Sequence, residues 1–63
     1  MRFTAVHFNE DKEIEFAILT DDYTEEEVKL GMHILNLKKD MKKMKLDSLQ
    51  VFDQDNKLVS IVY

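Results

Sequence analysis

The sequence predicts an α+β domain in which two antiparallel hairpins form one sheet and a single long helix covers one face of it. Two observations lead to this prediction. Residues 24–45 repeat their apolar side chains at a helical period, whereas the segments on either side are short and rich in β-branched and aromatic residues. The predicted order is ββαββ, with strands at about residues 2–8, 13–20, 48–53 and 57–63.

The first hairpin is predicted from a polar turn between two apolar segments. Residues 9–12 are polar, and a two-residue loop at Glu10 and Asp11 suits the change of direction. Side chains alternate along a strand, so this loop sets which of them share a face. The register predicts one face made of Phe3, Ala5, His7, Ile14, Phe16 and Ile18.

The helix is predicted to run without interruption over about residues 24–45. Thr24 and Glu27 have the spacing of a capping box, in which each side chain bonds the other's backbone amide. Acidic residues gather at the start and lysines at the end, which complements the helix dipole. Gly31 falls inside this segment, and a close approach by a neighbouring group is one reading of it; simple tolerance is the other.

The second hairpin is predicted around residues 53–57, with Asn56 as the best candidate for a left-handed conformation. A three-residue loop would place Leu49, Val51, Val59 and Ile61 on one face. Phe52, Leu58 and Val62 would then share the other face. Together with Val6, Phe8 and Leu19 of the first hairpin they exceed what one helix can cover, and an exposed apolar face usually marks an interaction surface.

A chain of 63 residues forms one domain, spanning residues 1–63, and such a domain is only marginally stable. The chain has no cysteine, so neither disulfides nor thiolate zinc sites can reinforce the fold. We expect no cofactor and no metal. Association with a second copy is the remaining source of stability.

The helix has more apolar surface than one small sheet needs. Its main stripe follows a 4-3-4-3 spacing. Val28, Gly31, Met32 and Leu35 form a second apolar group. Either a wide sheet wraps the helix, or one stripe meets a second copy across a two-fold axis. We expect a homodimer, with the interface at Leu30, Ile34, Leu37, Met41 and Met44. A sheet-face dimer or strand addition at a sheet edge are the competing arrangements.

Charge is distributed unevenly. Acids dominate up to Gly31 and lysines dominate after it, within a net charge of −4. The acidic segment 21–27 is explained by capping and solubility. The lysine-rich segment lacks arginine and aromatic residues, which argues against nucleic acid without excluding it. Its possible contacts to a polyanion are Lys38, Lys39, Lys42, Lys43 and Lys45.

No catalytic arrangement can be assigned. His7 is expected on the core face of the first hairpin and His33 on the polar side of the helix, and neither has a nucleophile or acid partner at a recognisable spacing. We therefore expect a non-enzyme. No apolar run approaches the length that spans a membrane, and charge near the N-terminus precludes a signal peptide. The chain is expected to be a complete cytoplasmic protein that does not enter membranes.

These observations predict a small interaction or regulatory protein that binds a macromolecule, works as a homodimer and has an unknown protein partner. Its size suits an accessory factor of a phage or mobile element. The alternative is a nucleic-acid-binding module that uses the lysine-rich C-terminal half of the helix.

Overall fold

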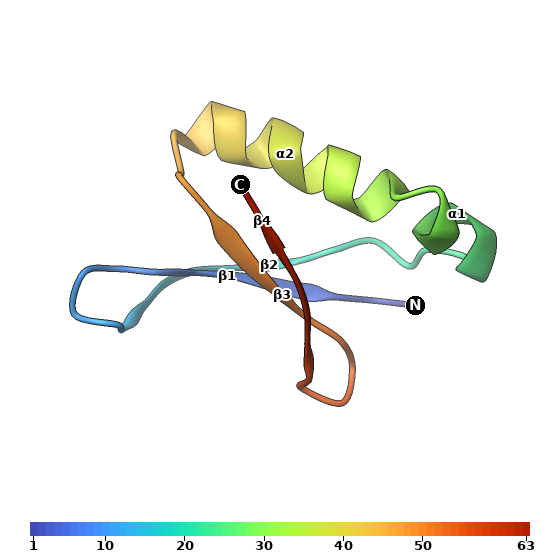
Figure 1. Ribbon diagram of the computed structural model, residues 1–63, viewed down its shortest axis with the longest axis horizontal. Coiled ribbons are helices and arrows are strands. Elements are labelled where there is room, and N and C mark those ends of the chain that lie inside the picture. Colours follow the sequence, from blue (N-terminus) through green and yellow to red (C-terminus); the bar gives the residue numbers. More distant parts are fainter.

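The computed structural model describes all 63 residues, and it has two layers, a four-stranded antiparallel sheet and a pair of helices on one of its faces (Figure 1). The predicted α+β class is confirmed, and the chain has two strands, a helical segment and two further strands in the predicted succession. The elements are β1 (Thr4–Phe8), β2 (Ile14–Leu19), α1 (Glu25–Lys29), α2 (Met32–Met44), β3 (Leu49–Phe52) and β4 (Leu58–Val62).

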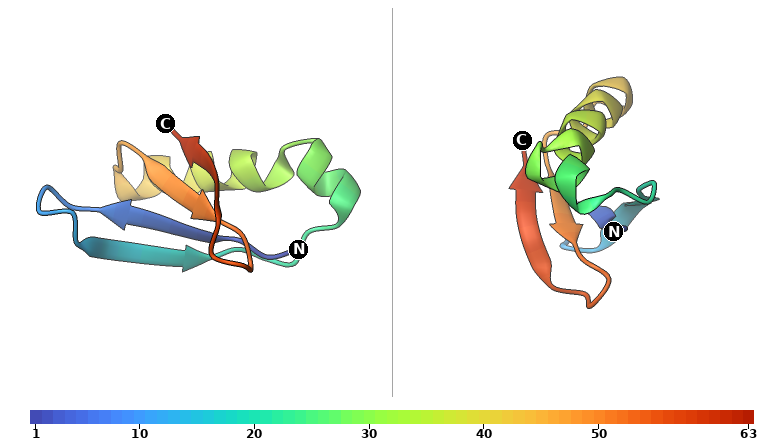
Figure 2. Two further views of the ribbon diagram at one scale, coloured as in Figure 1. Left: turned by 60° about the horizontal axis from the view of Figure 1, so that its bottom comes forward. Right: turned by 90° about the vertical axis from the view of Figure 1, so that its right-hand side faces the viewer.

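The two hairpins join side by side through their first strands. The strand order is β2-β1-β3-β4, so β1 and β3 are central, and β2 and β4 form the edges. β1 and β3 pair antiparallel, with Thr4 opposite Phe52 and Val6 opposite Gln50. Both helices lie on the same side of this twisted sheet (Figure 2). The other face of the sheet has no layer over it.

The first hairpin forms in a different register from the one predicted. Its loop is longer, because the Asn9 amide bonds the Glu13 carbonyl and Lys12 takes a left-handed conformation with φ 62°. Ala5 therefore pairs with Ile18. A bulge then shifts the pairing after His7, so that Phe8 lies opposite Ile14. The prediction that Ile14 shares the core face is wrong, because one extra residue in a strand reverses the faces beyond it.

The second hairpin has the predicted three-residue loop, closed by Asp53 and Lys57, and Asn56 has the expected positive φ of 61°. Beyond the loop, a bulge at Val59 shifts the register, so that Leu49 pairs with Val62. The predicted face of Leu58, shared with Phe52, is confirmed, whereas the predicted faces of Ile61 and Val62 beyond the bulge are wrong. Val62 is buried in the core, and Ile61 lies on the opposite side of the sheet.

The single predicted helix is interrupted. The capping box of Thr24 and Glu27 is present at the start of α1. Gly31 has φ 73°, a left-handed conformation that ends α1 and starts α2 in a new direction. Nothing lies within 4 Å of the position where a Cβ would be added to Gly31. The glycine thus serves a change of chain direction and not a close approach.

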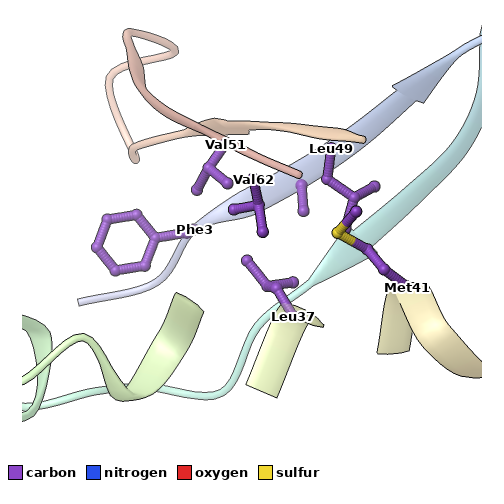
Figure 3. Close-up of a cluster of buried hydrophobic side chains, with 7 residues drawn as sticks. Phe3, Leu37, Met41, Leu49, Val51 and Val62 are labelled. Atoms are coloured by element: carbon purple, nitrogen blue, oxygen red, sulfur yellow. The ribbon is translucent and has the colours of Figure 1, made fainter. Parts of the chain in front are cut away.

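The core lies between α2 and the sheet (Figure 3). Leu37 and Met41 point from α2 toward side chains of β3 and β4, and Phe3 closes one end. The spacing of four residues puts both α2 side chains on one face of the helix. The buried cluster consists of Phe3, Ala5, Leu37, Met41, Leu49, Val51 and Val62.

Candidate functional site

The predicted interface stripe of the helix is mostly part of the chain's own core. Leu37 and Met41 are buried, and Ile34 packs against the same cluster. The sheet thus already covers Leu37 and Met41, and a covered side chain cannot receive a second chain. Leu30 is 75% exposed, but it caps α1 before the change of direction at Gly31. Met44 is partly exposed at the far end of α2.

The outer surface of α2 is basic. At ~100° per residue, its lysines lie roughly 100° to 240° from Leu37, on the side that faces away from the sheet. Met32 and Leu35 lie among them and are exposed. We call this surface the basic ridge; it consists of the exposed residues Lys38, Lys39, Lys42, Lys43 and, at the helix end, Lys45.

The sheet face opposite the helices forms the larger apolar surface. The observed pairings place ten residues on it, eight of them apolar and none charged. We call it the open face. Its members are Thr4, Val6, Phe8, Ile14, Ala17, Leu19, Gln50, Phe52, Leu58 and Ile61.

Strand alternation and the two bulges together create the open face. Val6 lies at its centre and is only 6% exposed, although it is not part of the core cluster. Phe8 and Phe52 are half-buried beside it, whereas Ile14 and Leu19 at the β2 edge stand clear, Leu19 being 68% exposed. A shallow depression of about 330 Å³ lies on this face, with Val6, Phe8, Ile14 and Phe52 in its lining.

Both edge strands are poor templates for adding another strand. β2 and β4 each carry a bulge, at Glu15 and at Val59. A bulge leaves one residue unpaired and bends the strand, which disturbs a regular ladder with a further chain. β2 also bears the charge of Glu15 along its edge. Association by strand addition is therefore disfavoured relative to contact through the open face.

The two histidines have structural surroundings. His33 is 7% exposed, and its ring stacks on that of Phe3 and lies near the tilted ring of Tyr23. The prediction of a polar helix side for His33 is wrong, since its position lies only about 40° from Leu37 around the helix. Burial lowers the pKa of His33, and its Nδ1 has no hydrogen-bond partner. His7 is half-buried, with Nδ1 3.0 Å from the Ser48 carbonyl oxygen.

A polar cleft separates the end of β2 from the flank of α2. Its volume is about 380 Å³, and Asp21, Asp40, Lys39 and Lys43 give it mixed charge. The Asn36 amide donates a hydrogen bond to the Tyr23 hydroxyl, which ties the β2–α1 connection to α2. The cleft wall is therefore already used in holding the two layers together.

No three histidine, cysteine, aspartate or glutamate side chains are grouped so that they could hold a metal ion. Neither helix combines the length and the apolar character needed to cross a membrane.

The fold and its surfaces thus define a small two-layer α+β protein with a bare apolar sheet face. Comparisons with protein-family models, with curated proteins and with solved structures find no match. Sequence reasoning identified Val6, Phe8, Leu19, Phe52 and Leu58 of the open face. It missed Ile14 and Ile61, because nothing in the local pattern signals the bulges that bring them there.

Proposed function

We propose that this protein is a small, non-enzymatic interaction protein of the cytoplasm, and that it acts by binding a macromolecule on the open face. The observation that carries the proposal is the composition of that face. Eight apolar side chains gather on it without a charge, and large apolar patches on soluble proteins mark interaction surfaces. Homodimerisation and a regulatory or accessory role, as in a phage or mobile element, are parts of the same proposal.

A photo-crosslinking experiment in the native host tests this proposal. A photoreactive phenylalanine analogue is placed at Ile61, which is 44% exposed on the open face. The matched control carries the same analogue at Leu35, which is 57% exposed on the outer side of α2. We expect adducts with a macromolecule from position 61 and few from position 35. Equal adduct yields at the two positions, or adducts from position 35 alone, would contradict the proposal.

The second candidate function is nucleic-acid binding through the basic ridge. The placement of the basic ridge favours this function. All of its lysines are exposed, so they can contact a polyanion without any change in the packing of the helix on the sheet. Contacts between lysine and phosphate release counterions, so the affinity should fall steeply with salt. The double substitution Lys38→Glu and Lys42→Glu should abolish a mobility shift that the unaltered protein gives at low salt. An unaltered protein that leaves DNA and RNA mobility unchanged at low salt would remove this candidate.

A further inference from the structure

We infer that the occupant of the open face is the open face of a second copy of this chain, related to the first by a two-fold axis. The assembly would have four layers, with the two sheets in the middle and the helices outside. This inference rests on the proposed function and names the partner of the same surface.

The width of the open face favours a sheet as its occupant. Four strands spaced ~4.8 Å apart make a surface about 20 Å wide, and strands of four to six residues make it about 17 Å long. One helix is about 10 Å wide and would leave half of that surface in water. An extended peptide would cover still less. A second sheet matches the surface, and twisted sheets pack face to face in aligned or orthogonal arrangements.

Charge favours the open face over the helix surface for self-association. Around a two-fold axis each patch meets its own copy, so a charged patch meets like charge. The open face carries no charged residue, and its polar members are only Thr4 and Gln50. The basic ridge would bring lysines toward lysines. The predicted stripe is covered by the chain's own sheet, as Leu37 and Met41 show.

The small core gives a reason for the second copy. Nine apolar residues are buried in the chain, and there is no cysteine to form a disulfide. A two-fold contact would bury additional apolar side chains and extend the cluster around Val6. The flat projection of the face is roughly 340 Å² per copy, or about 680 Å² for two copies, which is below the value of about 1,000 Å² for a stable specific interface and typical of a weak one. The dimer is accordingly expected to dissociate on dilution.

The first test is the mass of the purified protein at several concentrations, measured by sedimentation equilibrium. We expect twice the chain mass of 7.5 kDa at high micromolar concentration and a shift to the single mass on dilution. Gln50→Lys places a charge at the centre of the open face, and both copies would carry it. Gln54→Lys adds the same charge at the exposed turn before β4 and serves as the matched control.

Gln50→Lys should raise the dissociation constant of the dimer at least 100-fold, whereas Gln54→Lys should change it less than about threefold. Gln50 is polar and half-buried, so the substitution is compatible with the folded monomer, which circular dichroism verifies. A dimer that Gln50→Lys leaves unchanged would overturn the inference. A protein that stays monomeric at millimolar concentration would also overturn it.

A second measurement does not depend on any variant. In a mixture of labelled and unlabelled chains, isotope-filtered nuclear Overhauser effects report contacts between copies. Such effects from the methyl groups of Val6, Leu58 and Ile61 support the inference. Effects from Leu30 and Leu35 would overturn it and place the dimer on the helices. The crosslinking at Ile61 tests the proposed function separately. Adducts with another macromolecule at this position would support the proposed function even if the second copy is not the occupant.

Discussion

The imidazole of His33 stacks on the ring of Phe3, with centroids 4.6 Å apart and an angle of 20° between the planes. This pair joins the start of α2 to the residue that leads into β1. The ring of Tyr23 also lies near the imidazole, tilted by 58° with its centroid 6.0 Å from that of His33. A histidine is thereby used as an aromatic packing residue at a helix end.

We expect the protein to lose stability as the pH falls below about 6.5. Burial lowers the pKa of His33 from its ordinary value of 6.5, so the unfolded chain binds the proton more readily than the folded one. The stability from the neutral ring is complete above pH 6.5 and decreases as the pH falls through the lowered pKa. Urea unfolding at pH 7.5 and at lower pH values measures the change. In His33→Phe the part of the slope due to this group should vanish, and an unchanged slope would contradict the assignment.

Gly31→Ala should destabilise the protein by about 1 kcal/mol, although alanine is the better helix former. The reason is the left-handed conformation of Gly31, with φ 73°, since the space around it is open. Thermal unfolding measures the effect. Ala substituted for Lys29, which ends α1 in an ordinary helical conformation, is the control and should change stability little. A higher melting temperature for Gly31→Ala would show that the two helices can merge without cost.

Leu37→Ala and Leu35→Ala should differ sharply. Leu37 is buried in the core, and truncation there should cost about 2–5 kcal/mol through lost packing and a cavity. Leu35 lies on the outer side of α2, and its truncation should change the free energy of unfolding by less than about 0.5 kcal/mol. Denaturant titration of the two variants at one protein concentration makes the comparison. Similar costs for both would indicate that the outer side of α2 is also covered.

Ser60→Ala should leave stability unchanged or raise it by up to about 1 kcal/mol. The Ser60 hydroxyl is buried without a hydrogen-bond partner, and an unsatisfied polar group costs free energy that alanine avoids. Thr20→Ala is the control, because the Thr20 hydroxyl accepts from the Phe3 amide and donates to the Asp21 carbonyl. It should lower stability by about 1 kcal/mol. A clear loss of stability in Ser60→Ala would mean that its hydroxyl has a partner in solution.

The sequence predicts what depends on local chemistry. Thr24 and Glu27 form the capping box because their spacing alone permits it, and Asn56 takes its left-handed turn conformation for a similarly local reason. The order of strands along the chain also follows from local polarity. These features depend only on residues that are near in sequence, and the pairing of distant strands does not affect them.

The sequence does not predict what depends on a single inserted residue. The bulges at Glu15 and Val59 reverse the faces of the residues beyond them, and the predicted faces of Ile14 and Val62 are therefore wrong. Gly31 interrupts the helix while the apolar spacing continues across it, which conceals the break. The prediction for His33 follows its polarity, although its angular position around the helix places it with the core.

The open face could be anticipated in part. Alternation in the first hairpin already separates Val6 and Phe8 from the core residues. Both lie on β1, and the bulge in β2 does not change which face the β1 side chains occupy. The prediction of an interface on the helix stripe depends on how much sheet is available to cover it, which the sequence does not show. Once β1 and β3 are central, the sheet offers Leu37 and Met41 a complete cover, and the surplus apolar surface lies on the opposite side.

The pairing of Thr4 with Phe52 has a consequence for how the chain folds. Each hairpin can close within microseconds, because its partners are near in sequence. The ladder between β1 and β3 joins residues almost fifty positions apart. The chain must therefore lose the conformational entropy of closing this long loop before any hydrogen bond between the two strands forms. Contacts of such long range slow folding. The meeting of β1 and β3 is therefore expected to limit the folding rate, and neither hairpin should persist as a stable fragment without the other.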